Sequence, residues 1–172
     1  SAASDVYKRQ VNEIVKIGKE LGVPVIVDNT FLTPYNLTPL DRGVDIEIHS
    51  VTKYLNGHSD VVGGVVVGSK NYIDMIWERM IRYGGSMDPV SAFLLERGLK
   101  TLSLRMERHN VNALRIATFL STHEKVRNVI YPTLDNYPYI LSSVRYLTKG
   151  AGGMVSFEIK GDDEDGLKFM RN

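Results

Sequence analysis

Apolar residues recur at helical spacing at the start of the chain and at strand spacing soon afterwards. Within Val11–Leu21, apolar residues three or four positions apart predict an amphipathic helix that ends at Gly22. The β-branched run Val23–Val27 predicts a buried strand, and alternating apolar and polar residues in Val44–Ser50 predict a second. The proline-containing segment Thr33–Pro39 between them predicts a loop. The buried face of the helix is expected to consist of Val11, Ile14, Ile17 and Leu21.

Strands and helices continue to alternate along the rest of the chain. The predicted elements are a strand at Val61–Gly68, helices at Asn71–Ile81, Asp88–Leu95 and Thr101–Leu120, strands at Val126–Tyr131 and Met154–Ile159, and a helix that starts at Asp162–Asp165. We expect Trp77 to be a core or interface residue. The long helix is expected to bury a stripe made of Leu104, Val111, Leu114, Ala117 and Leu120. This order predicts an α/β domain with a mostly parallel sheet over residues 11–132, then a linker and the start of a second domain over 133–172.

The first ten residues, Ser1–Gln10, are small and polar and have no hydrophobic face. We interpret them as a non-native leader of the kind that a cloning or sequencing adapter adds, and exclude them from the predicted fold. They also lack the apolar central stretch of a signal peptide.

Composition narrows the class of protein. The 172 residues carry 21 Lys and Arg against 20 Asp and Glu, a net charge of +1, which argues against a nucleic-acid partner. No apolar stretch approaches the roughly 20 residues that span a bilayer, so we expect no membrane association. The absence of cysteine excludes disulfides, thiolate metal sites and a cysteine nucleophile, and is consistent with a cytoplasmic location.

The densest group of polar residues, His49–Asp60, follows the second predicted strand. The hydroxyl groups of Ser50 and Thr52 would share one side if the strand persisted and could hold a phosphate, although the same residues also commonly cap turns. Lys53 follows at the end of this buried strand, where desolvation would favour a neutral amine that can form a Schiff base. The alternative for Lys53 is a solvated surface charge.

Asp28 lies at the carboxyl end of the first predicted strand, the end at which open α/β sheets bind ligands. A carboxylate that faces a pyridine nitrogen keeps that nitrogen protonated, as pyridoxal phosphate catalysis requires. Asp28 could equally begin an Asx turn. The residues alone leave both interpretations open.

Several motifs resemble the pyridoxal-phosphate-dependent enzymes of cysteine and methionine metabolism, the transsulfuration family. The resemblance runs from about Val11 to Ile159 and is carried by Val27–Phe31, Ser50–Tyr54, Asn56–Asp60, Gly63–Gly64 and Arg97–Leu102. It implies a type I, aspartate-aminotransferase-like large domain with three α/β/α layers, incomplete here, and the start of a small α+β C-terminal domain. Because family members are considerably longer, we expect this chain to be an internal piece of such an enzyme.

The resemblance also implies residue roles. Lys53 would carry the internal aldimine of pyridoxal 5'-phosphate and act as general base, Asp28 would pair with the ring nitrogen, and Ser50 and Thr52 would hold the phosphate. The implied reaction is elimination or replacement at Cβ or Cγ of sulfur-containing or O-acylated homoserine-type amino acids. The implied partner is a second copy of the chain, in a homo-oligomer.

Two alternatives from other classes remain. His58, Asp60 and His109 match the His-x-Asp…His order of a non-haem iron oxygenase, although the predicted helices between them argue against its β-sandwich. We interpret His58 and Asp60 instead as supports of the turn after Lys53. The second alternative is a catalytically inactive piece that retains only a cofactor-binding or dimerisation surface.

Overall fold

The structure, a computed structural model, describes residues 11–137 and 146–171. The predicted leader Ser1–Gln10 and part of the predicted linker lie outside the described residues. The chain separates into two units between Met106 and Glu107, within the long helix α6 (Leu102–Ser121), and each unit is described by itself. The domain boundary expected between residues 132 and 133 is a different division and stays a prediction.

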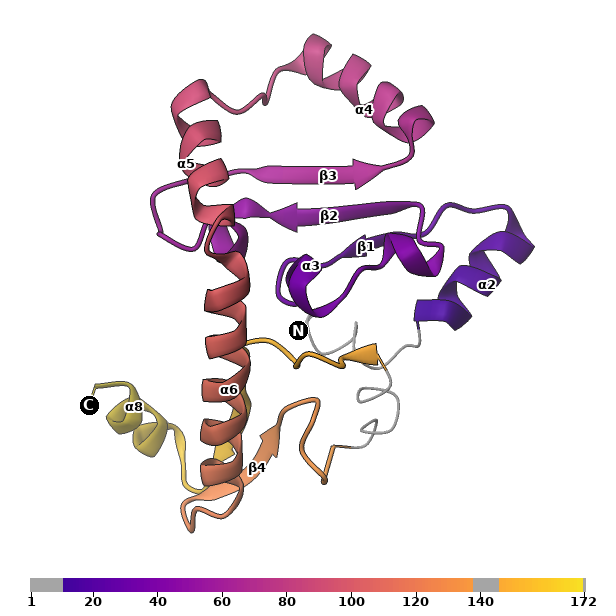
Figure 1. Ribbon diagram of the computed structural model, residues 1–172. Coiled ribbons are helices and arrows are strands. Elements are labelled where there is room, and N and C mark those ends of the chain that lie inside the picture. Colours follow the sequence, from indigo (N-terminus) through magenta and orange to yellow (C-terminus); the bar gives the residue numbers. More distant parts are fainter. Residues whose placement is uncertain (1–10, 138–145, 172) are drawn as a thin grey trace. The chain divides into compact units, whose positions relative to one another are not determined.

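The sheet of the first unit has three strands in the order β1 (Ile26–Asp28), β2 (Ile46–Ser50) and β3 (Gly64–Gly68), as Figure 1 shows. Strand β1 pairs with β2 in parallel, whereas β3 pairs with β2 antiparallel. The expected mostly parallel sheet is thus realised in one of the two described pairs. As a result, β1 and β2 end at the same edge of the sheet, where β3 begins.

The first strand is displaced from the predicted Val23–Val27. The N–H of Val25 donates to a side-chain oxygen of Asp45 at 2.8 Å, and its carbonyl accepts from the N–H of Asp45 and of Ile46. The backbone of Val25 is therefore hydrogen-bonded to the residues at the start of β2, but the regular strand pairing begins one residue later, at Ile26.

The predicted helices of the first unit are present, with ends within a few residues of expectation. They are α2 (Val11–Leu21), α4 (Lys70–Tyr83), α5 (Pro89–Leu99) and the first residues of α6. The expected loop Thr33–Pro39 contains instead a short helix, α3 (Thr33–Asn36), followed by a 3-10 turn at Leu40–Arg42. Proline is favourable in the first turn of a helix, where its missing N–H has no intrahelical partner in any case.

Asp88 begins α5 as an N-cap residue. Its side chain accepts hydrogen bonds from the backbone N–H groups of Val90 and Ser91, each at 3.0 Å. The side-chain hydrogen bond from Ser91, followed by these backbone bonds, lowers the pKa of Asp88. The Asp-Pro pair therefore begins this helix as the sequence predicts.

The buried face of α2 differs from the predicted one. Val15 is 6% exposed and packs in a cluster with Val44, whereas Ile17 is 53% exposed. A Cβ on Gly18 would lie 2.5 Å from a side-chain carbon of Val25, so α2 packs closely against Val25 at this glycine. A periodicity of large apolar residues does not mark a glycine as buried, which is why the face was misplaced.

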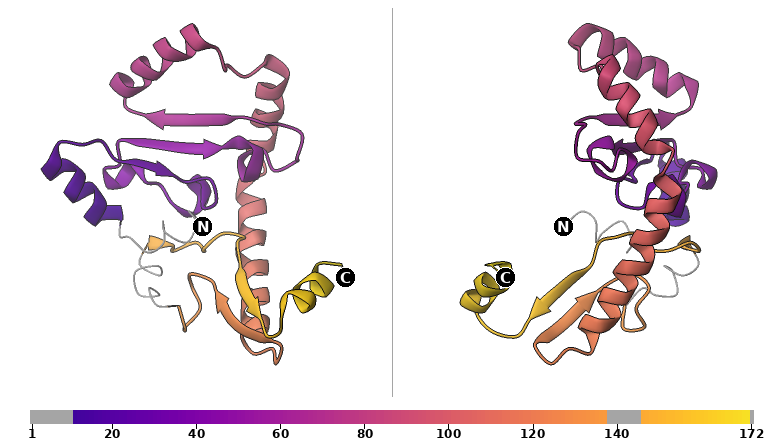
Figure 2. Two further views of the ribbon diagram at one scale, coloured as in Figure 1. Left: turned by 180° about the vertical axis from the view of Figure 1, so that it is seen from behind. Right: turned by 60° about the vertical axis from the view of Figure 1, so that its left-hand side comes forward.

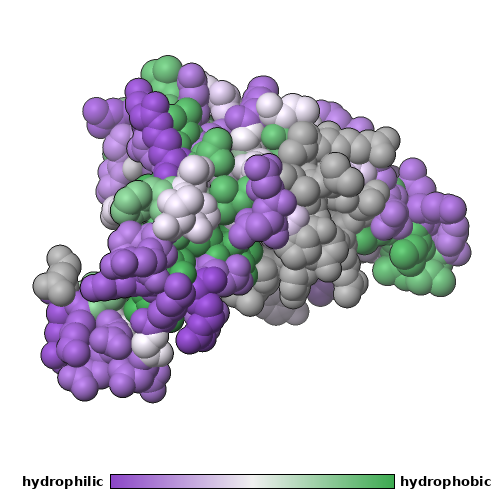
Figure 3. Space-filling view, turned by 90° about the horizontal axis from the view of Figure 1, so that it is seen from below, coloured by the Kyte–Doolittle hydropathy of each residue, from purple (hydrophilic) through white to green (hydrophobic). Residues whose placement is uncertain are grey.

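Helix α4 also exposes apolar side chains. Trp77, expected in a core or interface, is 57% exposed, and Ile81 is exposed beside it on the same helix. Figure 3 shows that hydrophobic residues reach the surface of the molecule among hydrophilic ones. Periodicity predicted the helix correctly; this face is not part of a core in the described chain, and its role as an interface stays a prediction.

The second unit pairs β4 (Val126–Ile130) with β5 (Ser156–Ile159) antiparallel and adds the helix α8 (Asp163–Arg171), as Figure 2 shows. This pair joins β4, which lies before the boundary expected at residue 132, to β5, which lies after it. The buried stripe predicted for α6 is wrong at Leu104, Val111 and Leu114, which are exposed, and right at Ala117.

Asn110 explains which face of α6 is buried in the second unit. Its side chain donates to the carbonyl of Lys149 and accepts from the N–H of Gly152 at 2.8 Å, so this polar residue faces inward together with Ala113 and Ala117. An amide side chain that pairs with backbone is not recognisable from apolar periodicity.

The observed face of α2 leads to a stability prediction. We expect Val15→Ala to lower the free energy of unfolding by about 2 kcal/mol because it opens a cavity beside Val44. The matched variant Ile17→Ala, on the exposed side of the same helix, is expected to lower it by less than about 1 kcal/mol. Urea unfolding followed by circular dichroism measures both values, and equal losses would contradict the assignment of the buried face.

Candidate active site

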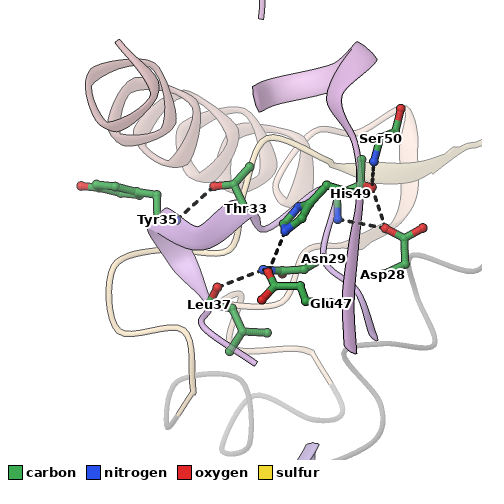
Figure 4. Close-up of polar contacts among 9 residues, drawn as sticks. Asp28, Asn29, Thr33, Tyr35, Leu37, Glu47, His49 and Ser50 are labelled. Carbon is green, nitrogen blue, oxygen red and sulfur yellow. Dashed lines mark hydrogen bonds and ion pairs between the residues drawn. The ribbon is translucent and has the colours of Figure 1, made fainter. Parts of the chain in front are cut away.

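Asp28 and Ser50 are the last residues of the parallel neighbours β1 and β2. Thr30 joins them, because its hydroxyl donates to Asp28 Oδ1 at 2.6 Å and accepts from the Ser50 N–H at 2.8 Å. Figure 4 shows Asp28 and Ser50 at this strand edge. The predicted convergence of the two strand ends is confirmed.

Asp28 also forms the Asx turn that the sequence left open. Its Oδ1 accepts from the backbone N–H of Thr30 at 3.0 Å in addition to the Thr30 hydroxyl. Both described hydrogen bonds use Oδ1, and the side chain is exposed. The turn thereby orients the carboxylate without covering its second oxygen.

Thr52 lies in the π-helical turn Val51–Leu55, directly after β2. Its hydroxyl oxygen accepts from the N–H of Gly63 at 3.1 Å, while the carbonyl of Gly63, at 3.5 Å, is too distant for a strong hydrogen bond. The hydroxyl therefore donates only weakly, to the Gly63 carbonyl, and a better acceptor could take its proton. Because the strand ends at Ser50, Thr52 is placed by the turn and not by the strand alternation that we expected.

Lys53 occupies the middle of the same turn. Its side chain is exposed, so the expected desolvation by a buried strand end is not observed in the described chain. Its backbone angles, φ −93° and ψ −124°, lie outside the helical region. The Lys53 carbonyl accepts from the N–H of Gly57 at 2.8 Å. We refer to residues 51–57 as the Lys53 turn.

Beneath this edge lies a buried polar network that sequence reasoning missed. Glu47 Oε1 lies 2.7 Å from Asn29 Nδ2 and 2.7 Å from His49 Nε2, and Asn29 Nδ2 also donates to the carbonyl of Leu37 at 2.9 Å (Figure 4). Asn29, Glu47 and His49 are all buried. The network therefore fixes the segment that follows Asp28.

The alternation in β2 concealed this network. The alternation of Ile46 and Ile48 with polar residues predicts the strand but does not indicate that Glu47 is buried, as it is in the structure. A detectable signal was that Glu47 and His49, two residues apart, share one face of the strand with opposite hydrogen-bonding character. A polar pair on one strand face, together with Asn29 after the neighbouring strand, would have indicated it.

Tyr54 follows Lys53 and is half-buried. Burial raises the pKa of its phenol, so the group stays protonated at neutral pH. Its ring contacts Phe31 edge-on, with centroids 6.3 Å apart. Tyr54 thus connects the Lys53 turn to the loop after β1.

Two residues of the alternative iron motif, His58 and Asp60, contact Asn56 at the end of the Lys53 turn. Asn56 donates from Nδ2 to Asp60 at 2.7 Å, and its carbonyl lies 2.7 Å from His58 Nδ1. Among residues 11–137 and 146–171, no group of three His, Cys, Asp or Glu side chains could hold a metal ion. The iron-oxygenase alternative is not supported, and His58 and Asp60 support the turn as expected.

An exposed amine, an oriented carboxylate and two hydroxyl-bearing residues therefore gather around the carboxyl edge of a parallel strand pair. The carboxyl ends of parallel strands are where open α/β proteins bind their ligands. The family model of the Cys/Met metabolism PLP-dependent enzymes matches residues 6–172, so its match begins inside the segment interpreted as a leader. The chain belongs to this family.

Individual relatives agree with the family. The chain is 43% identical to the L-methionine gamma-lyase of Porphyromonas gingivalis, over 99% of this chain and 43% of that protein. It is 45% identical to the cystathionine gamma-lyase of Dictyostelium discoideum, over 88% of this chain and 39% of that one. The chain therefore spans about two fifths of the length of these relatives.

A solved structure matches as well. The cystathionine gamma synthase of Xanthomonas oryzae pv. oryzae, in complex with aminoacrylate and cysteine, superposes with a TM-score of 0.90 at 39% identity, covering 93% of this chain and 41% of that one. The expected fold class, an incomplete type I fold of PLP-dependent enzymes, is confirmed. None of the helices in the described parts of the chain is long and apolar enough to cross a membrane.

The buried network leads to a second stability prediction. We expect Glu47→Leu to lower the free energy of unfolding by about 3 kcal/mol, because Asn29 Nδ2 and His49 Nε2 lose their common acceptor. Glu47→Gln is expected to cost about 1 kcal/mol or less, since its amide oxygen still accepts. Urea unfolding at neutral pH measures both variants. A Gln variant as unstable as the Leu variant would show that the carboxylate charge, not the acceptor, matters.

Proposed function

We propose that this chain binds pyridoxal 5'-phosphate, with Lys53 joined covalently to it. We further propose that the whole protein catalyses elimination or replacement at Cβ or Cγ of sulfur-containing or O-acylated homoserine-type amino acids. The observation that carries the proposal is the gathering of Asp28, Ser50, Thr52 and Lys53 at one sheet edge, with Asp28 tied to Ser50 through Thr30. Membership of the family supports it.

The donor set fits the cofactor. The exposed amine of Lys53 can replace the aldehyde oxygen, which leaves as water. The Thr52 hydroxyl donates only over a long distance, 3.5 Å, to the Gly63 carbonyl, and a phosphate oxygen could replace that acceptor; Ser50 provides a second hydroxyl two residues earlier. Asp28 presents an oriented carboxylate for a ring nitrogen.

The cofactor, when bound, supplies an electron sink for the carbanion that forms at Cα of the substrate. Asp28 would hold a proton on the ring nitrogen, and Thr30 would keep its carboxylate in place through Oδ1. Once substrate has displaced it, the Lys53 amine would act as general base: it would take the proton from Cα, return that proton to the cofactor, and then, as a free amine again, take one from Cβ so that the γ-substituent can leave. Ser50 and Thr52 would orient the site by holding the phosphate.

The substrate class is supported by the names of the relatives. L-methionine is named for the Porphyromonas gingivalis enzyme and cystathionine for the Dictyostelium discoideum and Xanthomonas oryzae enzymes. Both compounds carry a thioether sulfur, so the common requirement is departure or attachment of a sulfur group.

The proposal extends to assembly and location. We expect a homo-oligomer in the cytoplasm, without nucleic-acid or membrane partners, in keeping with the net charge of +1 and the absence of cysteine. The exposed apolar side chains of Trp77 and Ile81 on α4 are consistent with a second copy as partner. Light scattering of the cofactor-loaded protein measures this state.

The Schiff-base role of Lys53 is tested by absorption. Addition of pyridoxal phosphate to the protein is expected to produce a visible band that is absent in Lys53→Ala. Lys70→Ala is the matched control, because Lys70 is an exposed lysine that pairs only with Asp74 in the described contacts. Loss of the band in the control, or its retention in Lys53→Ala, would refute the assignment of the amine.

Turnover separates an active protein from a piece that only binds cofactor. The loaded protein is expected to convert L-methionine and water into methanethiol, 2-oxobutanoate and ammonia, or to process cystathionine or an O-acylhomoserine instead. Asp28→Asn keeps an acceptor for Thr30 but cannot hold the ring proton, and should slow turnover about a hundredfold or more. Assay of the oxo acid measures the turnover of the unmodified protein and of the Asp28→Asn variant. A visible band without turnover of any of these substrates would favour the inactive alternative.

A further inference from the structure

Arg105, at the start of α6, reaches back to the Lys53 turn. Its Nη1 donates to the carbonyl of Tyr54 at 2.6 Å, and its Nη2 lies 3.3 Å from the carbonyl of Leu55. The same Nη2 donates to the carbonyl of Gly98 at 2.8 Å, and Nε donates to the Thr101 hydroxyl at 3.1 Å. One guanidinium therefore joins the Lys53 turn to the end of α5 and the start of α6.

The acceptors are all neutral. Three of the four are backbone carbonyls and the fourth is a hydroxyl, so none of the described partners of Arg105 is a carboxylate. Burial also lowers the pKa of Arg105. Arg105 is thus partly desolvated and forms no ion pair among the described residues. Its planar, fork-shaped set of donors instead suits holding several carbonyl groups in fixed positions.

Two glycines allow this contact. Gly57 has a φ of +74°, and a Cβ there would overlap the guanidinium of Arg105. A Cβ on Gly98 would overlap the carbonyl of Asn56, so α5 can approach the Lys53 turn only at a glycine. The contact therefore requires Gly57 and Gly98 as well as Arg105.

The held segment contains an irregular backbone. Lys53 has non-helical angles inside an otherwise helical turn, so the backbone is kinked at this residue. The carbonyls of Tyr54 and Leu55, directly after Lys53, are the groups that Arg105 binds. The carbonyl of Lys53 itself is held by Gly57.

We propose that Arg105 is a positioning residue for Lys53. It fixes the backbone of the Lys53 turn so that the amine is presented toward the strand edge formed by Asp28, Ser50 and Thr52. This inference rests on the proposed function in one respect, namely that Lys53 is the residue that joins the cofactor.

The cofactor-free protein provides the first test. In Arg105→Lys the charge remains, but an ammonium cannot bind all these acceptors at once. Amide hydrogen exchange of Asn56 and Gly57, whose N–H groups bond Val51 and Lys53, is expected to become about tenfold faster. Exchange in α2 should not change. The control Arg108→Lys, at an exposed position of the same helix, should leave both unchanged.

The second test follows the covalent step. At saturating pyridoxal phosphate, the visible band should form about tenfold more slowly in Arg105→Lys than in the unmodified protein and in Arg108→Lys. If Arg105→Lys loosens the whole unit, seen as faster exchange in α2, then Gly57→Ala replaces it. That variant keeps Arg105 but displaces its guanidinium, and should produce both effects.

The outcomes are distinct. Absence of the band in the unmodified protein refutes the proposed function, and the exchange rates then decide alone whether Arg105 holds the turn. A band that forms equally fast in the unmodified protein and in the decisive variant overturns the positioning role. Unchanged exchange of Asn56 and Gly57 overturns it as well.

Discussion

The Thr30 hydroxyl bridge between Asp28 and Ser50 is the interaction on which the site depends. Parallel pairing brings the ends of β1 and β2 to one edge, but pairing alone leaves the Asp28 side chain free to turn. The hydroxyl donates to the carboxylate and accepts from the backbone N–H, so a single buried group fixes one strand end relative to the other. The Lys53 turn begins immediately after Ser50 and inherits that position.

Support for the bridge comes from two sides. Asn29, Glu47 and His49 hold the segment after Asp28 from within the unit, through hydrogen bonds among buried groups that would be costly to leave unpaired. The Lys53 turn packs against Gly98 of α5, and Arg105 of α6 donates a hydrogen bond to the carbonyl of that glycine. Buried and half-buried polar contacts thus hold in place the exposed side chains at the strand edge. The candidate site residues and the residues that support them are therefore different residues.

Prediction from sequence succeeded where a local pattern is sufficient. Apolar periodicity located all the long helices, and the Asp-Pro pair located the start of α5, because both depend on neighbours three or four residues away. It failed on which face is buried. In α2 and α6 the inward positions include Gly18 and Asn110, whose partners Val25 and Gly152 are distant along the chain or lie beyond the helix. The Glu47 network was missed for the same reason, since Asn29 and Glu47 are 18 positions apart. The short helix α3 was missed because its proline was interpreted as a loop signal, although proline is favourable in the first turn of a helix.

The sequence by itself determined the order of elements, the family to which the chain belongs, and the identity of the candidate site residues Asp28, Ser50, Thr52 and Lys53. These depend on local periodicity and on short contiguous motifs. Only the tertiary structure decided that Thr30 joins two strand ends and that Lys53 is exposed in an irregular turn. It also decided that Arg105 donates hydrogen bonds to the carbonyls that follow Lys53. The physical reason is that the hydrogen bonds of Thr30 with Ser50 and of Arg105 with Tyr54 join residues 20 and 51 positions apart, and hydrogen bonds over such separations leave no periodic trace in the chain.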